Sequence, residues 1–169
     1  LKNTELFRYE EPKNIGYGAA HNKNFAFLSK ETVYTLILNP DIKLNLDCLT
    51  ACMNYLDKER ETVLVAPKMF SGDGLYRSAK LLPNFFIHIQ RYLRLVPDVF
   101  NYEIKEYQYD IPMNSPNVSG AVWLVRSDVL HRLGGFDERF FLYMEDIDLS
   151  RRLHLEGPTV LLPTADVFH

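Results

Sequence analysis

The stretch from Gly134 to Gly157 contains the densest set of side chains that could do chemistry. Among its acids, Glu145, Asp146 and Asp148 are spaced to fall within about one helical turn. A carboxylate at the floor of a cleft can take a proton from an incoming hydroxyl, which is general-base catalysis. The competing interpretation is that these acids only stabilise a helix N-terminus, where the macrodipole favours negative charge. The apolar lead-in over residues 136–144 favours the base, since so apolar a segment is not expected to be a free loop and is interpreted as carrying the acids to the floor of a cleft.

The same stretch has the spacing of an amphipathic helix. Leu149 and Leu153 stand four residues apart, which places both on one helix face. The Gly-Pro pair at 157–158 is a typical helix end, and the basic pair at 151–152 precedes it. The sequence therefore predicts a helix that begins at Glu145 and places the acids in its first turn.

An acid also follows a short apolar run earlier in the chain. The run Val33–Leu38 is typical of a strand that is buried on both faces of a parallel sheet. It ends in Asn-Pro-Asp, and ligands of open α/β sheets bind beyond the C-terminal strand ends. Asp41 is therefore placed to hold a divalent cation through oxygen. The residues alone leave open the alternative that Asn-Pro-Asp is only a turn; a terminal His169 would add a metal contact if it folds back beside Asp41.

A glycine turn precedes the first predicted helix. Asn14 and Gly16 lie in this turn, and the helix is expected over residues 19–28. Such a turn can present backbone N–H groups to a phosphate, although many glycine turns are only connectors. Asn22 lies on an early turn of the helix, where it could reach a ligand or simply face solvent.

The remaining segments alternate between strand and helix patterns, which indicates an α/β fold with a mostly parallel sheet flanked by helices. Leu46, Leu49, Met53 and Leu56 predict an amphipathic helix that covers the sheet. We also expect strands at 62–66, 118–126 and 159–162, a hairpin at 71–74, an irregular segment at 99–117, and helices at 85–96 and 127–133. The 85–96 segment mixes aromatic and basic residues, so it permits contact with a membrane surface, although packing on its own domain is the commoner outcome.

Composition narrows the function classes. A length of 169 residues corresponds to one domain, and 47% hydrophobic residues are enough for a sizeable core. The net charge of −3 gives no reason to expect a nucleic acid as partner. Cys48 and Cys52 share one helix face and are interpreted as small core residues in a reducing compartment. No apolar run of 18 residues and no signal peptide is visible.

Five segments of this chain, in their order, resemble a known enzyme family: NIGYGAAHN, an apolar strand ending in NPD, VSGAVWLVR, GGFDERFFLYMEDIDLSRRLHLEG and PTADVFH. The order is similar to that of the family 2 glycosyltransferases of the GT-A fold, in particular the bacterial rhamnosyltransferase-like branch that builds surface polysaccharide. The likeness covers Asn14 to His169, and the long GGFDE–EDIDL–R–G motif is its most specific part. It implies a GT-A-like, Rossmann-like mixed sheet that is mostly parallel.

The resemblance implies an inverting, metal-dependent transfer of a sugar to an acceptor hydroxyl. Asp146 corresponds to the catalytic base, and Glu145 assists or orients it. Asp41 corresponds to the metal-binding acid of a DxD-type motif, and His169 to a histidine that completes the site around Mg²⁺ or Mn²⁺.

The resemblance also implies the substrates. Gly120 and Ala121 would line the donor sugar, whereas Asn14, Gly16 and Asn22 would lie near the donor nucleotide. The donor would be a dTDP- or UDP-linked sugar, rhamnose among the candidates, and the acceptor a saccharide or lipid-linked saccharide. Such chemistry is expected in the cytoplasm at the inner face of the cell membrane.

The family's opening strands, which hold the nucleotide base, have no counterpart before Leu1. Residues 1–169 are therefore expected to be a single, N-terminally truncated GT-A domain that comprises the end of the nucleotide-binding half and the acceptor-binding half. An open sheet edge in such a fragment favours association into a homo-oligomer. Two other hypotheses remain: a non-catalytic domain that binds a glycan or protein partner, and a nucleotidyltransferase, which would release pyrophosphate.

Overall fold

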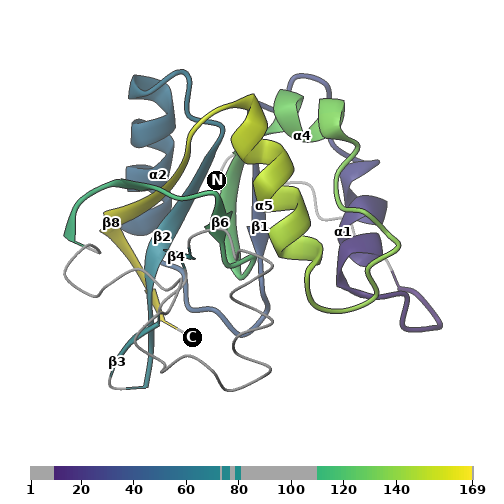
Figure 1. Cartoon of the computed structure of the whole chain (residues 1–169). Helices are drawn as coiled ribbons and strands as arrows, with labels where there is room; N and C mark the ends of the chain where they lie inside the picture. The colour runs from purple at the N-terminus through teal and green to yellow at the C-terminus, as the bar shows by residue number, and fades with distance from the viewer. Residues whose placement is uncertain (1–9, 73, 77–78, 81–109, 169) are drawn as a thin grey trace, which may run out of the picture.

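A six-stranded mixed sheet forms the centre of the computed structural model, which describes residues 10–72, 74–76, 79–80 and 110–168 (Figure 1). The strand order is β1-β7-β2-β8-β5, and β3 pairs with β2 outside this path. The strands are β1 (Tyr34–Leu38), β2 (Leu64–Ser71), β3 (Gly74–Tyr76), β5 (Met113–Asn114), β7 (Val122–Arg126) and β8 (Thr159–Phe168). A second, two-stranded sheet pairs β4 (Ala79–Lys80) with β6 (Asn117–Val118).

The strand directions correct the prediction of a mostly parallel sheet. β7 lies between β1 and β2 and runs antiparallel to both, and only the β2–β8 pairing is parallel among the described residues. β1, β2 and β8 nevertheless share one direction. The sequence could not show this, because an apolar run reports that a strand is buried but not which way it runs. The β1 strand also differs, since the Leu36 side chain is 36% exposed and the strand is not buried on both faces.

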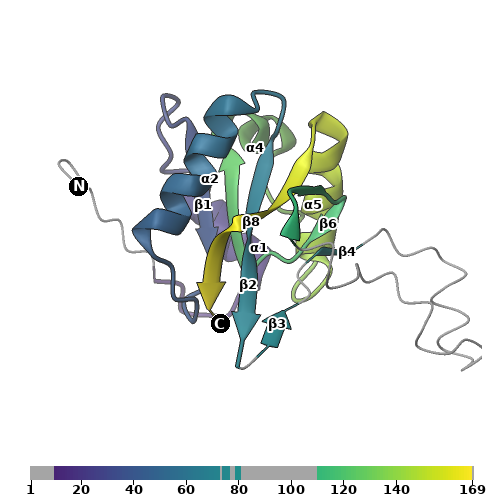
Figure 2. The same ribbon diagram turned by 90° about the vertical axis from the view of Figure 1, so that its left-hand side faces the viewer.

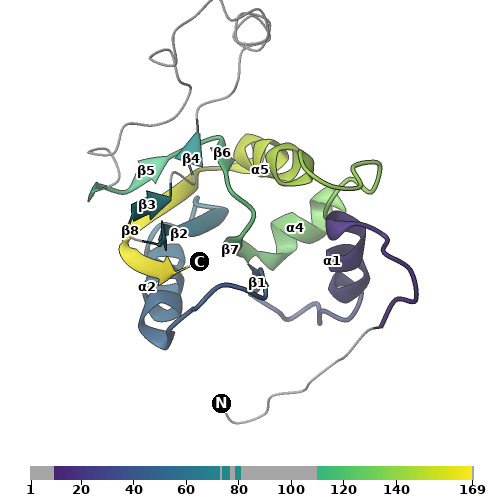
Figure 3. The same cartoon turned by 90° about the horizontal axis from the view of Figure 1, so that it is seen from below.

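Helices cover both faces of the sheet and give a three-layer arrangement (Figures 2 and 3). Helix α2 (Leu46–Lys58) lies on one face. Helices α1 (Tyr17–Phe25), α4 (Ser127–Leu133) and α5 (Glu145–Glu156) lie on the other. The start of α5 is therefore held on one side by the sheet and on the other by α1 and the loops around it.

The face that α2 buries matches the predicted one only in part, since Leu56 is buried and Leu49 packs against the core. Its buried residues are Cys48, Cys52 and Leu56, spaced four apart, so the two cysteines are core residues as expected. Leu46 and Met53 are 73% and 40% exposed. A side-chain cap explains the helix start, because the Asn45 carboxamide oxygen accepts a hydrogen bond from the backbone N–H three residues later.

The opposite core contains the largest buried side chain of the described residues, Trp123 of β7. Leu149 and Leu153 of α5 are fully buried in the same cluster, which confirms the helix face predicted from their spacing. Phe136, from the loop before α5, packs there too, with its ring stacked 6.2 Å from that of Trp123. The helix that presents the acids is thus fixed along its length by apolar packing.

Element ends follow the sequence signals with a few differences. Gly134 ends α4 in the left-handed conformation, with φ 72°, as a C-terminal glycine should. β2 continues through Pro67 with a register shift after it, and then forms the predicted hairpin with β3. The predicted helix over 85–96, most of the irregular segment over 99–117 and His169 lie outside the described residues. Within the part of the chain that the structure describes, no helix is long and apolar enough to cross a membrane.

Candidate active site

A cavity of about 230 Å³ lies at the start of α5. It brings together residues that the sequence places far apart: the Glu145–Asp146 pair, the turn before β7, and Asn39 at the end of β1. Its lining residues are Tyr17, Asn39, Met69, Tyr76, Ser119, Gly120, Ala121, Leu142, Tyr143, Glu145 and Asp146. Four of the predicted site residues, Gly120, Ala121, Glu145 and Asp146, therefore share one cavity.

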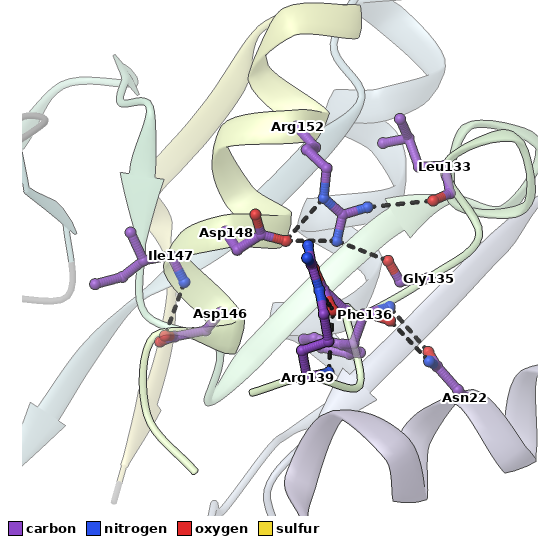
Figure 4. A network of polar contacts seen from close by, with 10 residues as sticks. Asn22, Leu133, Gly135, Phe136, Arg139, Asp146, Ile147, Asp148 and Arg152 are labelled. Atoms are coloured by element: carbon purple, nitrogen blue, oxygen red, sulfur yellow. Dashed lines mark hydrogen bonds and ion pairs between the residues drawn. The ribbon is translucent and has the colours of Figure 1, made fainter. Parts of the chain in front are cut away.

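Backbone N–H groups hold both carboxylate oxygens of Asp146. Oδ2 accepts a hydrogen bond from Gly120 N at 3.2 Å. Oδ1 accepts one from Ile147 N at 2.8 Å (Figure 4). The second donor belongs to the first turn of α5, where N–H groups have no intrahelical partner. Each oxygen keeps a further lone pair. The carboxylate is thus fixed in place and can still accept a proton from a bound hydroxyl.

Glu145 is more deeply buried than Asp146. Its side chain is 6% exposed, and Oε2 has no hydrogen-bond partner among the described residues. Burial raises the pKa of Glu145, and the charge of Asp146 adds to the rise, while a backbone hydrogen bond opposes it. A buried carboxylate oxygen without a donor is costly to the folded state. A ligand that supplies a donor in the cavity would remove this cost.

A second buried oxygen lines the same cavity. Asn39 donates its backbone N–H to Ala121 O at 2.9 Å, which ties the end of β1 to the turn before β7. Its side-chain Oδ1 is buried and has no hydrogen-bond partner in the described parts of the chain. Asp41 follows two residues later in an exposed turn and lies outside the cavity lining. The described residues contain no cluster of three or more His, Cys, Asp or Glu side chains that could hold a metal ion.

The predicted glycine turn lies against the loop before α5. Asn14 Oδ1 accepts a hydrogen bond from Gly16 N at 3.0 Å, which closes the turn. Gly16 has φ 91° and approaches the carbonyl oxygen of Phe141 so closely that a Cβ would clash with it. The glycine is required here both for its backbone conformation and for space. The next residue, Tyr17, donates its backbone N–H to the same carbonyl at 3.3 Å.

The side chain of Asn22 bonds the loop that leads from α4 to α5. Its side chain donates to Phe136 O at 2.8 Å, and its Oδ1 accepts from Phe136 N at 2.9 Å (Figure 4). The same amide also donates to Glu138 Oε1 at 3.1 Å. It is not among the residues that line the cavity at Asp146. Its amide instead fastens α1 to the loop that leads from α4 to α5.

Arg152 fastens the beginning of the same loop to α5, as Figure 4 shows. Its guanidinium donates to Asp148 Oδ2, to Leu133 O at 3.2 Å and to Gly135 O at 2.9 Å. Asp148 therefore serves an ion pair within α5 and not the cavity. The sequence analysis had placed Arg152 only at a helix end, because a bond to a loop 17 residues away leaves no local pattern.

The loop segment 141–144 is exposed although its composition is apolar. Its four side chains, Phe141, Leu142, Tyr143 and Met144, are 50–76% exposed, whereas Phe136 at the start of the apolar lead-in is buried. Tyr143 and Met144 also have φ of 67° and 72°, which non-glycine residues seldom adopt. Two of these side chains form one wall of the cavity, so the segment borders the cleft from outside.

Two lining residues, Tyr17 and Asn39, were not predicted as site residues. Tyr17 donates its hydroxyl to Gly120 O at 2.9 Å, and its pKa is raised well above the usual value by burial and by the charges of Asp146 and Glu145. Its position inside NIGYGAAHN was the only signal. Asn39 was visible as the first residue of NPD, but its buried oxygen could be recognised only from the fold.

Comparison with known proteins gives relatives of one kind. The chain is 30% identical over 174 residues to an N-acetylglucosaminyl-diphospho-decaprenol L-rhamnosyltransferase of Mycobacterium tuberculosis, an alignment that covers 92% of this chain and 56% of the relative. It is 30% identical over 168 residues to the rhamnosyltransferase WbbL of Escherichia coli, covering 90% of this chain and 60% of the relative. The chain thus spans a little over half the length of these relatives. No family model matches it.

A solved structure shares the fold. The crystal structure of GalNAc-T7 with UDP, GalNAc and Mn²⁺ aligns with a TM-score of 0.65 and 14% identity, over 95% of this chain and 31% of that one. At this identity the match supports the fold alone, namely the mixed sheet with helices on both faces.

Proposed function

We propose that this chain is a glycosyltransferase of the GT-A fold, like the rhamnosyltransferases to which it is similar. It transfers a sugar from a nucleoside-diphosphate donor to a hydroxyl of an acceptor, with inversion at the anomeric carbon. The observation that most supports this is the cavity at the start of α5. It combines a fixed carboxylate, Asp146, with two buried oxygens, on Asn39 and Glu145, that have no hydrogen-bond donor among the described residues. A sugar carries several hydroxyl groups that can donate hydrogen bonds to these buried acceptor oxygens.

In this proposal Asp146 is the general base. It takes the proton of the acceptor hydroxyl while that oxygen forms a bond to the anomeric carbon. The bond from that carbon to the diphosphate breaks on the opposite face, and the nucleoside diphosphate leaves. Glu145 borders the reacting centre and accepts a hydrogen bond from a sugar hydroxyl through its free oxygen. The turn at Gly120 and Ala121 lies against the sugar.

The donor nucleotide would bind on the side of the cavity where α1 begins. Asn14 and Gly16 shape that turn, and the proposal assigns them to the diphosphate or ribose region. Asn22 contributes indirectly, because its amide holds the loop that leads to α5. The base is proposed as thymine or uracil. The relatives' names favour a rhamnosyl donor and, for one of them, a lipid-linked acceptor.

A divalent cation, Mg²⁺ or Mn²⁺, is part of the proposal. The ligand atoms at the end of β1 fit such an ion, since Asn39 Oδ1 is a buried oxygen with no partner in the part of the chain that the structure describes, and the carboxylate of Asp41 follows two residues later. The resemblance adds His169, which lies outside the described residues. When bound, the ion would offset the negative charge that grows on the leaving diphosphate. The setting we propose is cell-envelope polysaccharide synthesis at the cytoplasmic side of the membrane.

Calorimetric titration of the protein with UDP and dTDP, each with and without Mn²⁺, tests the donor site. Metal-dependent binding that Asp41→Ala abolishes is the expected result. The matched control is Asp47→Ala, which removes another exposed acid, from the first turn of α2. Nucleotide binding without any metal dependence would contradict the cation site. Absence of all nucleotide binding would favour a domain that binds a glycan or protein instead.

A further inference from the structure

Tyr17 connects the start of α1 to the turn that holds Asp146. It is the first residue of α1 and lines the cavity. Its hydroxyl donates to the carbonyl oxygen of Gly120 at 2.9 Å. Its ring packs edge-on against His21, with centroids 4.5 Å apart, and against Phe136 at 5.7 Å. Packing fixes the ring, so the hydroxyl has a defined position.

Gly120 is held from two sides. Its carbonyl accepts from Tyr17, while its N–H donates to Asp146 Oδ2 at 3.2 Å. The turn also lies directly against the acid, since a Cβ on Gly120 would stand 2.8 Å from Asp146 Cβ. A displacement of this glycine would therefore move the hydrogen bond to the carboxylate as well as the wall behind it.

A second contact runs from Tyr17 to the other approach to Asp146. The backbone N–H of Tyr17 donates to Phe141 O at 3.3 Å, and residue 141 begins the loop that enters α5. That loop contains consecutive left-handed residues, Tyr143 and Met144, which keep their conformation only where the surroundings impose it. Tyr17 thus bonds both the turn that donates to Asp146 and the loop that leads into α5.

The hydroxyl of Tyr17 is also a permanent donor. Burial, followed by the charges of Asp146 and Glu145, raises its pKa well above the usual value for tyrosine. It stays protonated across the working pH range of an enzyme, so it does not compete with Asp146 as a base. Its remaining role is to fix the carbonyl to which it donates.

We propose that Tyr17 is a positioning residue of the transfer reaction: its hydroxyl fixes Gly120, and the Gly120 amide in turn fixes the carboxylate of Asp146. The proposal rests on the proposed function of Asp146 as base. It distinguishes the hydroxyl from the ring. The ring packs in the apolar cluster beside α1, whereas the hydroxyl bonds the carbonyl of Gly120, whose amide holds the acid.

Tyr17→Phe separates these roles, because it keeps the ring and removes the hydroxyl. The control is Tyr34→Phe, which removes a hydroxyl bonded to Asp57 Oδ1 at 2.5 Å, between β1 and α2. We expect Tyr17→Phe to lower kcat about three- to tenfold, as for one lost hydrogen bond, with the donor Kd unchanged. We also expect it to move the acid limb of the pH–rate profile to higher pH. Tyr34→Phe should change neither quantity.

Amide hydrogen exchange supplies a readout that needs no activity. The Gly120 amide should exchange about tenfold faster in Tyr17→Phe than in the unmodified protein, because its turn is no longer fixed. Unchanged exchange together with unchanged kcat would overturn the proposal. A fall in kcat together with a lower melting temperature and an unchanged pH–rate profile would also overturn it. That pattern would mean that the substitution disturbs the packing of the ring and not the position of the carboxylate. If the unmodified protein transfers no sugar, the proposed function fails, and the exchange of Gly120 alone decides whether Tyr17 fixes this turn.

Discussion

Substitution of Gly120 by alanine would disturb the proposed base without touching its chemistry. A Cβ at this position would stand 2.8 Å from Asp146 Cβ and 3.6 Å from Asp146 Oδ2. Carbon atoms in van der Waals contact are about 3.5–4.0 Å apart, so the methyl group is too close by about 0.7–1.2 Å. Either the turn before β7 or the first turn of α5 must move by roughly that distance, and the hydrogen bond from Gly120 N to Asp146 is lost.

Gly120→Ala is expected to lower both the free energy of unfolding and kcat. Overpacking of this kind lowers the free energy of unfolding by about 1–3 kcal/mol. A displacement near 1 Å at the reacting centre is expected to lower kcat about 100-fold. Initial rates of nucleoside diphosphate release and urea unfolding would measure the two effects. The control is Gly74→Ala in β3, where a Cβ would meet nothing within 4 Å.

A Gly120→Ala protein that is less stable but transfers sugar at the unmodified rate would refute the reasoning, since the acid beside it could then not be the base. Unchanged stability and unchanged rate would instead contradict the close contact between the turn and α5. Gly74→Ala should change the free energy of unfolding by less than about 0.5 kcal/mol, as an exposed substitution does.

Three further predictions concern stability. Arg152→Met should lower the free energy of unfolding by about 1–3 kcal/mol, because the guanidinium bonds that join α5 to the preceding loop are lost. Chemical unfolding measures this loss. The control is Arg151→Met, at an exposed position, and an equal loss of stability in that variant would contradict the prediction. The raised pKa of Glu145 means that the unfolded chain loses this proton first as pH rises above the ordinary value of 4.5, so stability falls with rising pH. Glu145→Gln should remove that fall in unfolding curves recorded at a series of pH values. An unaltered pH dependence would show that Glu145 is not the titrating group. Burial lowers the pKa of His21, so stability falls as pH drops below the ordinary value of 6.5; His21→Phe should remove this loss in thermal melts at pH 5 to 7, and retention of the loss would locate the titrating group elsewhere.

Local signals in the sequence predicted several elements well. Gly157 ends α5, Gly134 ends α4, and Leu149 and Leu153 are buried on one face, because caps and helical spacing depend on neighbouring residues alone. The gathering of Glu145 and Asp146 with the Gly120 turn in one cavity agrees with the proposed site, although their roles remain untested.

Features that depend on distant residues could not be predicted in this way. The antiparallel β7 between β1 and β2 reverses the expected sheet pattern, since apolar runs do not encode direction. The exposed segment at 141–144 looked like a core segment because its composition is apolar. Asn22 proved to bond a loop 114 residues away, and Tyr17 a carbonyl 103 residues away. Such contacts exist only after folding has placed α1 beside the loops around α5.

The central claim is that Asp146 removes the proton of an acceptor hydroxyl. Its most direct test compares sugar transfer by the unmodified protein and by Asp146→Asn, which keeps the shape of the side chain but cannot accept a proton in the same way. We predict that transfer falls by about 10²- to 10⁴-fold while the donor Kd and the unfolding curve stay unchanged. Transfer at the unmodified rate by a folded Asp146→Asn protein would contradict the account.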